Sequence, residues 1–279
     1  MMNALIVVYR ESFEALLIVG LLWSFLARQS ASKKGYQALL LGTVGGLALS
    51  LVLGFFIHRA ESEFEGLALE VFQLSMLVLA VELMTHMCIW MRKHARTLKS
   101  ELEAGAREAL TTGRFWSLTL LTIIAVGREG SETVIFLYGL WTESVESGQT
   151  GAFVGLALAG LGLGAATWYA FQHGFKAFTQ KTYFTVSTFL LFITAGSLVI
   201  AIARKVIELG WVTIGTEAAW NSEGVLSDQN PVGSFLSLLT GYHTQPALFV
   251  VFAYVAYWAV VVTLYRQAGQ VPRVTAHAS

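Results

Sequence analysis

Seven long runs of mostly apolar residues constrain this sequence more than any other feature. A helix needs roughly 20 mostly apolar residues to cross the hydrocarbon core of a bilayer, and 55% of this chain is hydrophobic while 13% is charged. The strands of transmembrane β-barrels are shorter than these runs and alternate between apolar and polar residues. We therefore expect the runs to cross the membrane as helices. We predict an all-α integral membrane protein with transmembrane helices at about 4–27, 36–57, 67–91, 116–141, 152–172, 182–203 and 246–265.

The charges between these runs predict the orientation of the chain in the membrane. Lys and Arg concentrate in the first, third and fifth connections and in the C-terminal tail, whereas Glu concentrates in the second, fourth and sixth. Positively charged connections are ordinarily cytoplasmic, so we expect the N-terminus outside and the C-terminus inside. The first run lacks a basic segment before it, so we interpret it as a retained helix rather than a signal peptide.

Two connections are long enough to have structure of their own. The inner connection at about 92–115 is polar and is expected to form a solvated or interfacial helix. The outer connection at about 204–245 is expected to form an irregular cap.

An internal duplication relates the two halves of the chain. When the sequence is aligned with itself at a shift of 118 residues, three charged residues match three others. Arg10, Glu11 and Glu14 align with Arg128, Glu129 and Glu132, respectively. Repeating an odd number of helices inverts the second unit in the membrane, as in many transporters. We therefore predict one transporter domain over 1–279, built as a 3+3 inverted repeat (about 4–91 and about 116–203) plus an extra helix at about 246–265.

Each repeat carries the pattern Arg-Glu-x-x-Glu inside an apolar run, in VVYRESFEALLIVG and IAVGREGSETVIFLYG. Residues three and four apart share a helix face, so each copy presents two carboxylates beside a guanidinium. A charge near the bilayer centre costs about 2.5–3.5 kcal/mol even on the lenient insertion scale, so these six charges must face one another or water. The candidate ligands are Glu11, Glu14, Glu129 and Glu132, with Arg10 and Arg128 in support.

The donor set indicates a hard cation. Carboxylate oxygens suit Fe³⁺, Mg²⁺, Ca²⁺ and Mn²⁺, whereas soft ions prefer sulfur, and the single cysteine, Cys88, excludes a thiolate cluster. Four Glu and two Arg leave an excess of negative charge, which favours binding of a cation or protons. The alternative is a purely structural role, in which two Arg–Glu pairs lock helices together.

The paired motifs, on the first and fourth of seven predicted helices, resemble the high-affinity iron permease family. Its members are the oxidase-dependent iron transporters of fungi and their bacterial relatives, some of which are named lead permeases. The stretches IWMRKHAR and GYHTQPALFVVFAYVAYW are also similar to the family, so the resemblance covers essentially the whole chain. It implies a multi-pass protein of a bacterial inner membrane that moves iron inward, with both motifs essential.

Four further residues are weaker candidates. Glu82 and His86, four residues apart on the third predicted helix, could complete the metal site or relay a proton. Glu82 could instead pair with one of the motif arginines, and His86 could be an ordinary buried histidine. Glu143 and Glu146, expected on a short outer loop, match the acidic residues with which the family is credited for gathering iron, or are plain solvated surface.

The resemblance also predicts the partners. They are an iron ion, the bilayer, and an extracytoplasmic protein that oxidises Fe²⁺ or delivers iron, so that Fe³⁺ is carried. We expect no permanently bound cofactor, no enzymatic activity and no nucleic acid. The alternatives are transport of another cation such as Pb²⁺ or Mn²⁺, a passive channel with a Glu ring, and an intramembrane di-iron enzyme. Di-iron bundles use Glu-x-x-His, which neither motif provides.

Overall fold

The computed structural model describes residues 2–94, 97–146, 148, 150–173, 180–224, 226–227 and 230–269. Within these residues the chain is helical, with one isolated antiparallel bridge between Ala218 and Ala247. Two helices are short, α4 (Leu98–Thr112) and α8 (Pro231–Thr240). The long helices are α1 (Met2–Arg28), α2 (Lys33–Glu63), α3 (Leu67–His94), α5 (Phe115–Glu146), α6 (Thr150–Gln172), α7 (Gln180–Glu208) and α9 (Leu248–Gly269).

The long helices lie where the seven apolar runs predict them. Five of them, α2, α3, α6, α7 and α9, are long and apolar enough to cross a membrane. With 27 and 32 residues, α1 and α5 are comparably long, but each has the three charges of one Arg-Glu-x-x-Glu motif near its middle. The chain is therefore a helical, multi-pass membrane protein, and the two long helices outside this set of five are the ones that carry the motifs.

Helix α2 extends beyond its predicted range at both ends. Its 31 residues span about 46 Å at about 1.5 Å per residue, which exceeds the roughly 30 Å of a hydrocarbon core. Its last two turns carry the exposed ion pair between Arg59 and Glu63. The apolar run used for the prediction ends where the lipid is expected to end, whereas the helix itself continues into the polar region.

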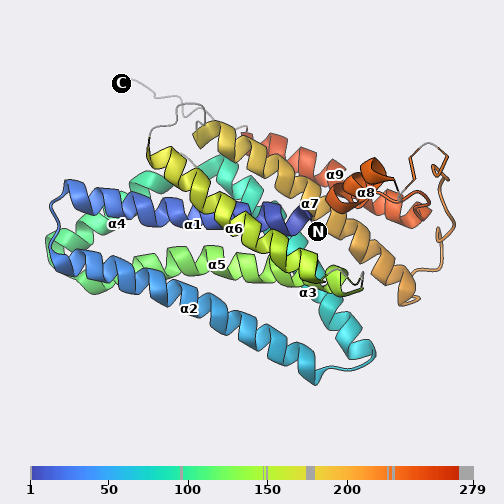
Figure 1. Ribbon diagram of the computed structural model, residues 1–279, viewed down its shortest axis with the longest axis horizontal. Helices are drawn as coiled ribbons and strands as arrows, with labels where there is room; N and C mark the ends of the chain where they lie inside the picture. Colours follow the sequence, from blue (N-terminus) through green and yellow to red (C-terminus); the bar gives the residue numbers. More distant parts are fainter. Residues whose placement is uncertain are drawn as a thin grey trace, which may run out of the picture.

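The helices pair across the two halves of the chain. Helix α1 packs mainly against α6, α2 packs mainly against α5, and α3 packs against α7. Figure 1 shows α1 and α5 side by side and running in opposite directions. The first helix of each unit therefore packs on the second helix of the other unit, and the two motif helices are antiparallel.

Glycines allow these close pairings. A Cβ added to Gly42 of α2 would lie 2.8 Å from the Thr119 carbonyl oxygen of α5. A Cβ added to Gly160 of α6 would lie 2.6 Å from the Leu5 carbonyl oxygen of α1. The i, i+4 pairs that contain these glycines form smooth helix faces, as is common at helix contacts in membranes.

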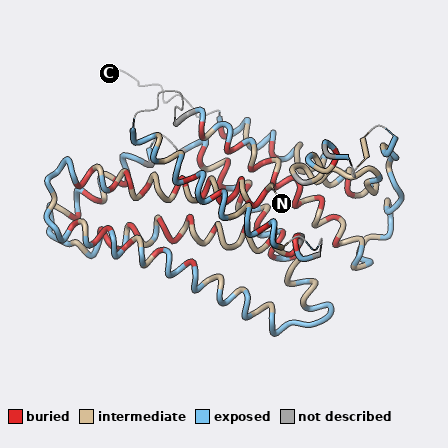
Figure 2. The backbone as a smooth tube through the Cα atoms, viewed as in Figure 1, coloured by how far each residue is buried: buried red, intermediate tan, exposed pale blue. Residues whose placement is uncertain are grey.

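Two buried apolar clusters lie on either side of the motifs. One contains Ala4 and Val7 of α1 with Phe136 of α5, and the other contains Ile18 of α1 with Leu118 of α5. The charged residues at 10–14 and 128–132 fall between the clusters in both helices. Figure 2 shows the buried positions concentrated on the central helices, while α2 is largely exposed along its length. The motifs thus form a polar layer inside an apolar bundle.

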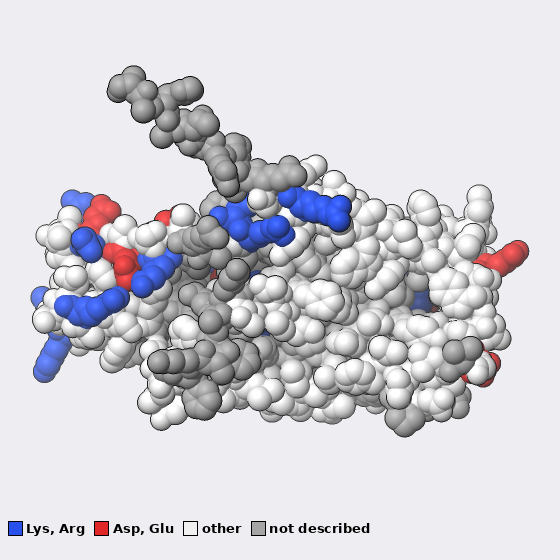
Figure 3. Space-filling model, turned by 90° about the horizontal axis from the view of Figure 1, so that it is seen from above, with Lys and Arg blue, Asp and Glu red and all other residues white. Residues whose placement is uncertain are grey.

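Helix α4 confirms the polar helix predicted in the third connection. It packs against α5 and α1, and Arg28 Nη2 lies 2.9 Å from Glu103 Oε1. Figure 3 shows most of the visible Lys and Arg over one half of the face, with some acidic residues among them, and further acidic residues at the edge of the opposite end. A broad uncharged surface lies between them, as expected for a belt in contact with lipid.

Helix α8 corrects the irregular cap expected at about 204–245. Pro231 stands in the first turn of this 10-residue helix, and Gly241 ends it with φ of 73°. Proline fits the first turn because that turn has no intrahelical acceptor for its missing N–H, and glycine adopts the left-handed conformation that ends a helix. This pair of signals in the sequence marks the helix.

Candidate metal centre

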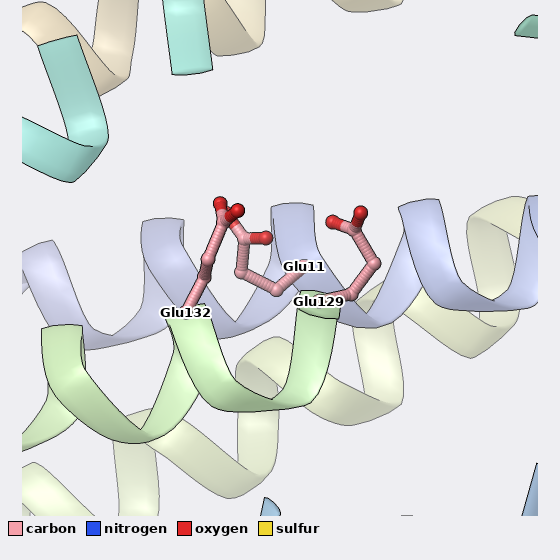
Figure 4. Close-up of side chains that lie close together, drawn as sticks. All are labelled: Glu11, Glu129 and Glu132. Carbon is pink, nitrogen blue, oxygen red and sulfur yellow. The ribbon is translucent and has the colours of Figure 1, made fainter. Parts of the chain in front are cut away.

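Three glutamates from the two motif helices converge at the contact between α1 and α5. Figure 4 shows Glu11 on α1 beside Glu129 and Glu132 on α5, with the three carboxylates close together. One oxygen from each side chain lies within 4.8 Å of the other two. The residues are 1%, 6% and 9% exposed, respectively. Two carboxylates from one helix and one from the other therefore share a buried volume that a single cation can reach.

Each of these carboxylates has one oxygen without a hydrogen bond. Among the described residues, Oε2 of Glu11, of Glu129 and of Glu132 is buried and has no hydrogen-bond partner. Buried polar atoms in folded proteins are almost always paired, because an unpaired one loses its hydration without compensation. Three converging carboxylates, each with a buried oxygen that lacks a hydrogen bond, are a suitable donor set for a hard metal ion.

Glu14, the fourth predicted ligand, is bound by the arginine of its own motif. Arg10 Nε lies 2.7 Å from Glu14 Oε1, an ion pair whose angle is not that of a hydrogen bond. Arg10 Nη1 lies 3.3 Å from Glu11 Oε1, so one guanidinium contacts both acids of the first copy. Arg10 is completely buried.

In the second copy, the arginine contacts one acid and is more accessible. Arg128 Nε donates a hydrogen bond of 2.9 Å to Glu132 Oε1, and the Arg128 side chain is 37% exposed. Its guanidinium carbon lies 4.6 Å from the centre of the Trp90 ring, a cation–π contact. The two arginines thus occupy different environments although their motifs are equivalent in sequence.

The side chains around the motifs include three that the sequence did not single out for this role. Met87 Sδ accepts a hydrogen bond of 3.2 Å from Arg10 Nη1, Tyr183 Oη donates to the Arg10 carbonyl oxygen at 3.4 Å, and Trp90 covers Arg128. Methionines recur at helical spacing on α3, a pattern that is equally typical of packing. Met87 and Trp90 lie three residues apart, so α3 presents one face to both motif arginines.

Glu82 and His86 do not join this site. Both side chains are exposed, whereas their neighbours Met84 and Met87 are buried in the bundle. The expectation that the third helix buries these two side chains is wrong, because both positions lie on an exposed side of α3. A span that is apolar all round gives no periodic signal that distinguishes its two faces.

Glu143 and Glu146 belong to the last turns of α5 rather than to a short loop. The expected loop is therefore corrected to helix. Their side chains lie outside the part of the chain that the structure describes, so their suggested part in gathering iron stays a prediction.

Comparisons with known proteins show which sequences this chain is similar to. The sequence profile described as the Iron permease FTR1 family matches residues 1–269. A protein of Yersinia pestis named ferrous iron permease EfeU is 34% identical over 255 residues, which cover 90% of this chain and 88% of that protein. A protein of the same name from Escherichia coli O6:H1 is 33% identical over 246 residues, 87% of each chain.

No solved structure matches the chain. The profile match spans nearly the full sequence, and the similar proteins are named as permeases, which are transporters rather than enzymes. The chain belongs to the iron permease FTR1 family.

Proposed function

We propose that this protein carries iron inward across the membrane through a site made by Glu11, Glu129 and Glu132, with Glu14 as a fourth carboxylate. The observation that carries the proposal is that each of the first three side chains, which converge, has a buried oxygen without a hydrogen-bond partner. An iron ion would supply these oxygens with the positive charge that hydrogen bonds do not.

In this proposal all seven long helices cross the membrane, with the N-terminus outside and the C-terminus inside. The charged residues of α1 and α5 face each other between two apolar clusters. Both helices can therefore lie in the membrane without exposing these charges to lipid, which would be costly. The antiparallel course of α1 and α5, with the pairing of α1 with α6 and of α5 with α2, supports an inverted repeat. Sites in such transporters lie near the midplane at the repeat interface.

The arginines balance the empty site. Four Glu and two Arg give the ionised cluster a formal charge of −2, which attracts an arriving cation. Arg10 contacts Glu11 and Glu14, and Arg128 contacts Glu132. When iron binds, the guanidinium groups release part of this contact, and a rocking movement of the two repeats opens the site inward.

The cargo in this proposal is Fe³⁺, formed from Fe²⁺ by an extracytoplasmic partner that oxidises or delivers iron. Carboxylate oxygens suit the harder ion, whereas the relatives from Yersinia pestis and Escherichia coli are named for ferrous iron. Uptake of iron held as Fe²⁺ by a reductant, with no oxidant present, would overturn the Fe³⁺ part and leave the carboxylate site standing.

Uptake of radioactive iron into vesicles containing the purified protein tests the site. The double variant Glu14→Ala with Glu132→Ala should lose uptake, while Glu63→Gln, an exposed acid at the end of α2, should keep it. Normal iron accumulation by the double variant would contradict the carboxylate site. Competition by Mn²⁺ and Pb²⁺ in the same vesicles tests the alternative cargoes, since equal transport of either ion would contradict selectivity for iron.

A further inference from the structure

Arg10 shares one of its terminal nitrogens between an acid and a sulfur atom. Nη1 lies 3.3 Å from Glu11 Oε1 and donates a hydrogen bond of 3.2 Å to Met87 Sδ. Contacts between a charged N–H and a carboxylate are ordinarily about 2.7–2.9 Å long, so the contact with Glu11 is a long one. The short contact is with the other acid, since Nε lies 2.7 Å from Glu14 Oε1. The guanidinium is therefore closely paired with Glu14 and loosely paired with Glu11.

Met87 is the neutral member of the group of side chains around this guanidinium. Among the described residues, the side-chain acceptors that Arg10 contacts are the carboxylates of Glu11 and Glu14 and the sulfur of Met87. Nη2 is buried there without a hydrogen-bond partner. Arg10 is completely buried and Met87 is 1% exposed, so solvent cannot replace a partner that Arg10 loses. When Glu11 moves away from Nη1, Met87 is the acceptor that stays.

A thioether has the properties that this position requires. Its sulfur is a weak and uncharged acceptor, so it accepts an N–H without adding to the negative charge of the site. A carboxylate in its place would compete with Glu11 and Glu14 for the guanidinium. A purely aliphatic side chain would leave a buried N–H of Arg10 dependent on Glu11 alone, because an unpaired buried donor is costly.

Iron binding changes the balance among these contacts. In the proposed function Glu11 becomes a ligand of the ion, and its contact with Nη1 weakens. Nε is still paired with Glu14 and Nη1 is still bonded to Met87, so the guanidinium keeps its place beside the site. Without the sulfur, Nη1 would have Glu11 as its one acceptor, and Arg10 would compete with the metal for that carboxylate.

We propose that Met87 is a positioning residue of the iron site, whose sulfur retains Arg10 beside Glu14 and so frees Glu11 for the metal. This role rests on the proposed function, because it assumes that Glu11 is a ligand. Met87 acts through Arg10 and does not bind the ion itself. Helix α3 thereby takes part in metal binding although it contributes no ligand.

Replacement of the sulfur alone tests this role. Met87→Leu keeps a buried apolar side chain of similar volume and removes the acceptor. Titration of the purified protein, with whichever of Fe²⁺ and Fe³⁺ the wild type transports, should show a Kd at least about fivefold higher. The matched control is Met84→Leu, one turn away in the apolar core cluster, which should stay within about twofold of the wild type. Unchanged binding by Met87→Leu, or equal weakening by both variants, would overturn the proposal.

Rescue and transport kinetics separate positioning from packing. Met87→Gln supplies an amide oxygen as acceptor and should restore the Kd to within about twofold of the wild type. In vesicles, Met87→Leu should raise the iron concentration for half-maximal uptake and keep the maximal rate within about twofold, whereas misfolded protein lowers the maximal rate. A folded Met87→Gln that binds as weakly as Met87→Leu would overturn the role of the sulfur.

The glutamate variants distinguish a failure of this inference from a failure of the proposed function. Loss of iron binding in Glu129→Gln with Glu132→Gln, together with wild-type binding in Met87→Leu, would overturn the role of Met87 and leave the carboxylate site standing. Wild-type binding in the glutamate double variant would overturn the site itself, and the role of Met87 with it.

Discussion

The two copies of Arg-Glu-x-x-Glu are equivalent in sequence and unequal in structure. The Arg10 side chain is 1% exposed and contacts both acids of its own motif, whereas the Arg128 side chain is 37% exposed and contacts one. The first copy contributes one carboxylate to the triad, and the second contributes two. Duplication of a motif therefore does not give two identical half-sites. One half has a buried arginine that contacts both of its acids, and the other has a partly exposed arginine that contacts one.

The difference arises from what covers each arginine. Arg10 is enclosed by α3 and α7, where Met87 accepts its N–H and Tyr183 bonds its backbone. Arg128 is covered on one side by the ring of Trp90. We interpret α1 as the rigid half of the site and α5 as the half that responds to iron.

Replacing each motif arginine in turn should give the largest difference in stability between the two copies. Arg10→Gln should destabilise the protein by about 3–5 kcal/mol, because it leaves two buried carboxylates without their counter-charge. Arg128→Gln should cost less than Arg10→Gln, because the Arg128 guanidinium is partly exposed and solvent screens its contact with the buried Glu132. Thermal unfolding in detergent measures both. Equal losses of melting temperature would show that the two halves are equally rigid.

The glycine contacts test whether both motif helices depend on close packing. Gly160→Ala should destabilise the protein by about 1–3 kcal/mol, because its Cβ meets the backbone of α1 and the core is overpacked. Gly42→Ala should do the same through α5. The matched control is Gly162→Ala, which has nothing within 4 Å of the added carbon. It should be neutral or stabilising by up to about 1 kcal/mol. A tolerated Gly160→Ala would contradict the tight α1–α6 contact.

Substitution of single acids tests the unequal contributions to the triad. Glu132→Gln should weaken iron binding by at least about tenfold, or about 1.4 kcal/mol, because it neutralises a converging ligand. Glu14→Gln should weaken binding less, because Glu14 is not one of the three converging carboxylates. Titration of the purified protein with iron measures both. A larger effect from Glu14 would exchange the roles assigned to the two residues.

The smallest expected effect comes from Trp90. Trp90→Leu should destabilise the protein by about 0.5–1 kcal/mol through loss of the cation–π contact with Arg128. The loss should disappear in an Arg128→Gln background, which a double-mutant cycle of melting temperatures detects. An undiminished loss in that background would assign Trp90 to packing alone.

Most of the fold can be predicted from the sequence, because a segment that crosses lipid must be a long and mostly apolar helix. Seven apolar runs, one polar helix and a repeat offset are enough to place the long helices and to bring Glu11 near Glu129 and Glu132. The spacing of the motif alone does not predict the ion pair between Arg10 and Glu14, because several neighbouring positions on a helix can supply the acid that pairs with one guanidinium.

The lipid environment also explains the main error of the prediction, which concerns the direction of two side chains on α3. A helix in lipid is apolar on every side, so the outward direction of Glu82 and His86 could not be read from hydropathy. Helix α8 differs from the expectation for another reason: at 10 residues it is too short to be recognised by length, and its end residues Pro231 and Gly241 mark it instead.

An anomalous difference map at the iron absorption edge, from crystals of the iron-loaded protein, tests the central claim most directly. The account predicts one peak among the carboxylates of Glu11, Glu129 and Glu132, and its loss in Glu129→Gln with Glu132→Gln. A peak at any other place, with the triad empty while the same preparation transports iron, would contradict it.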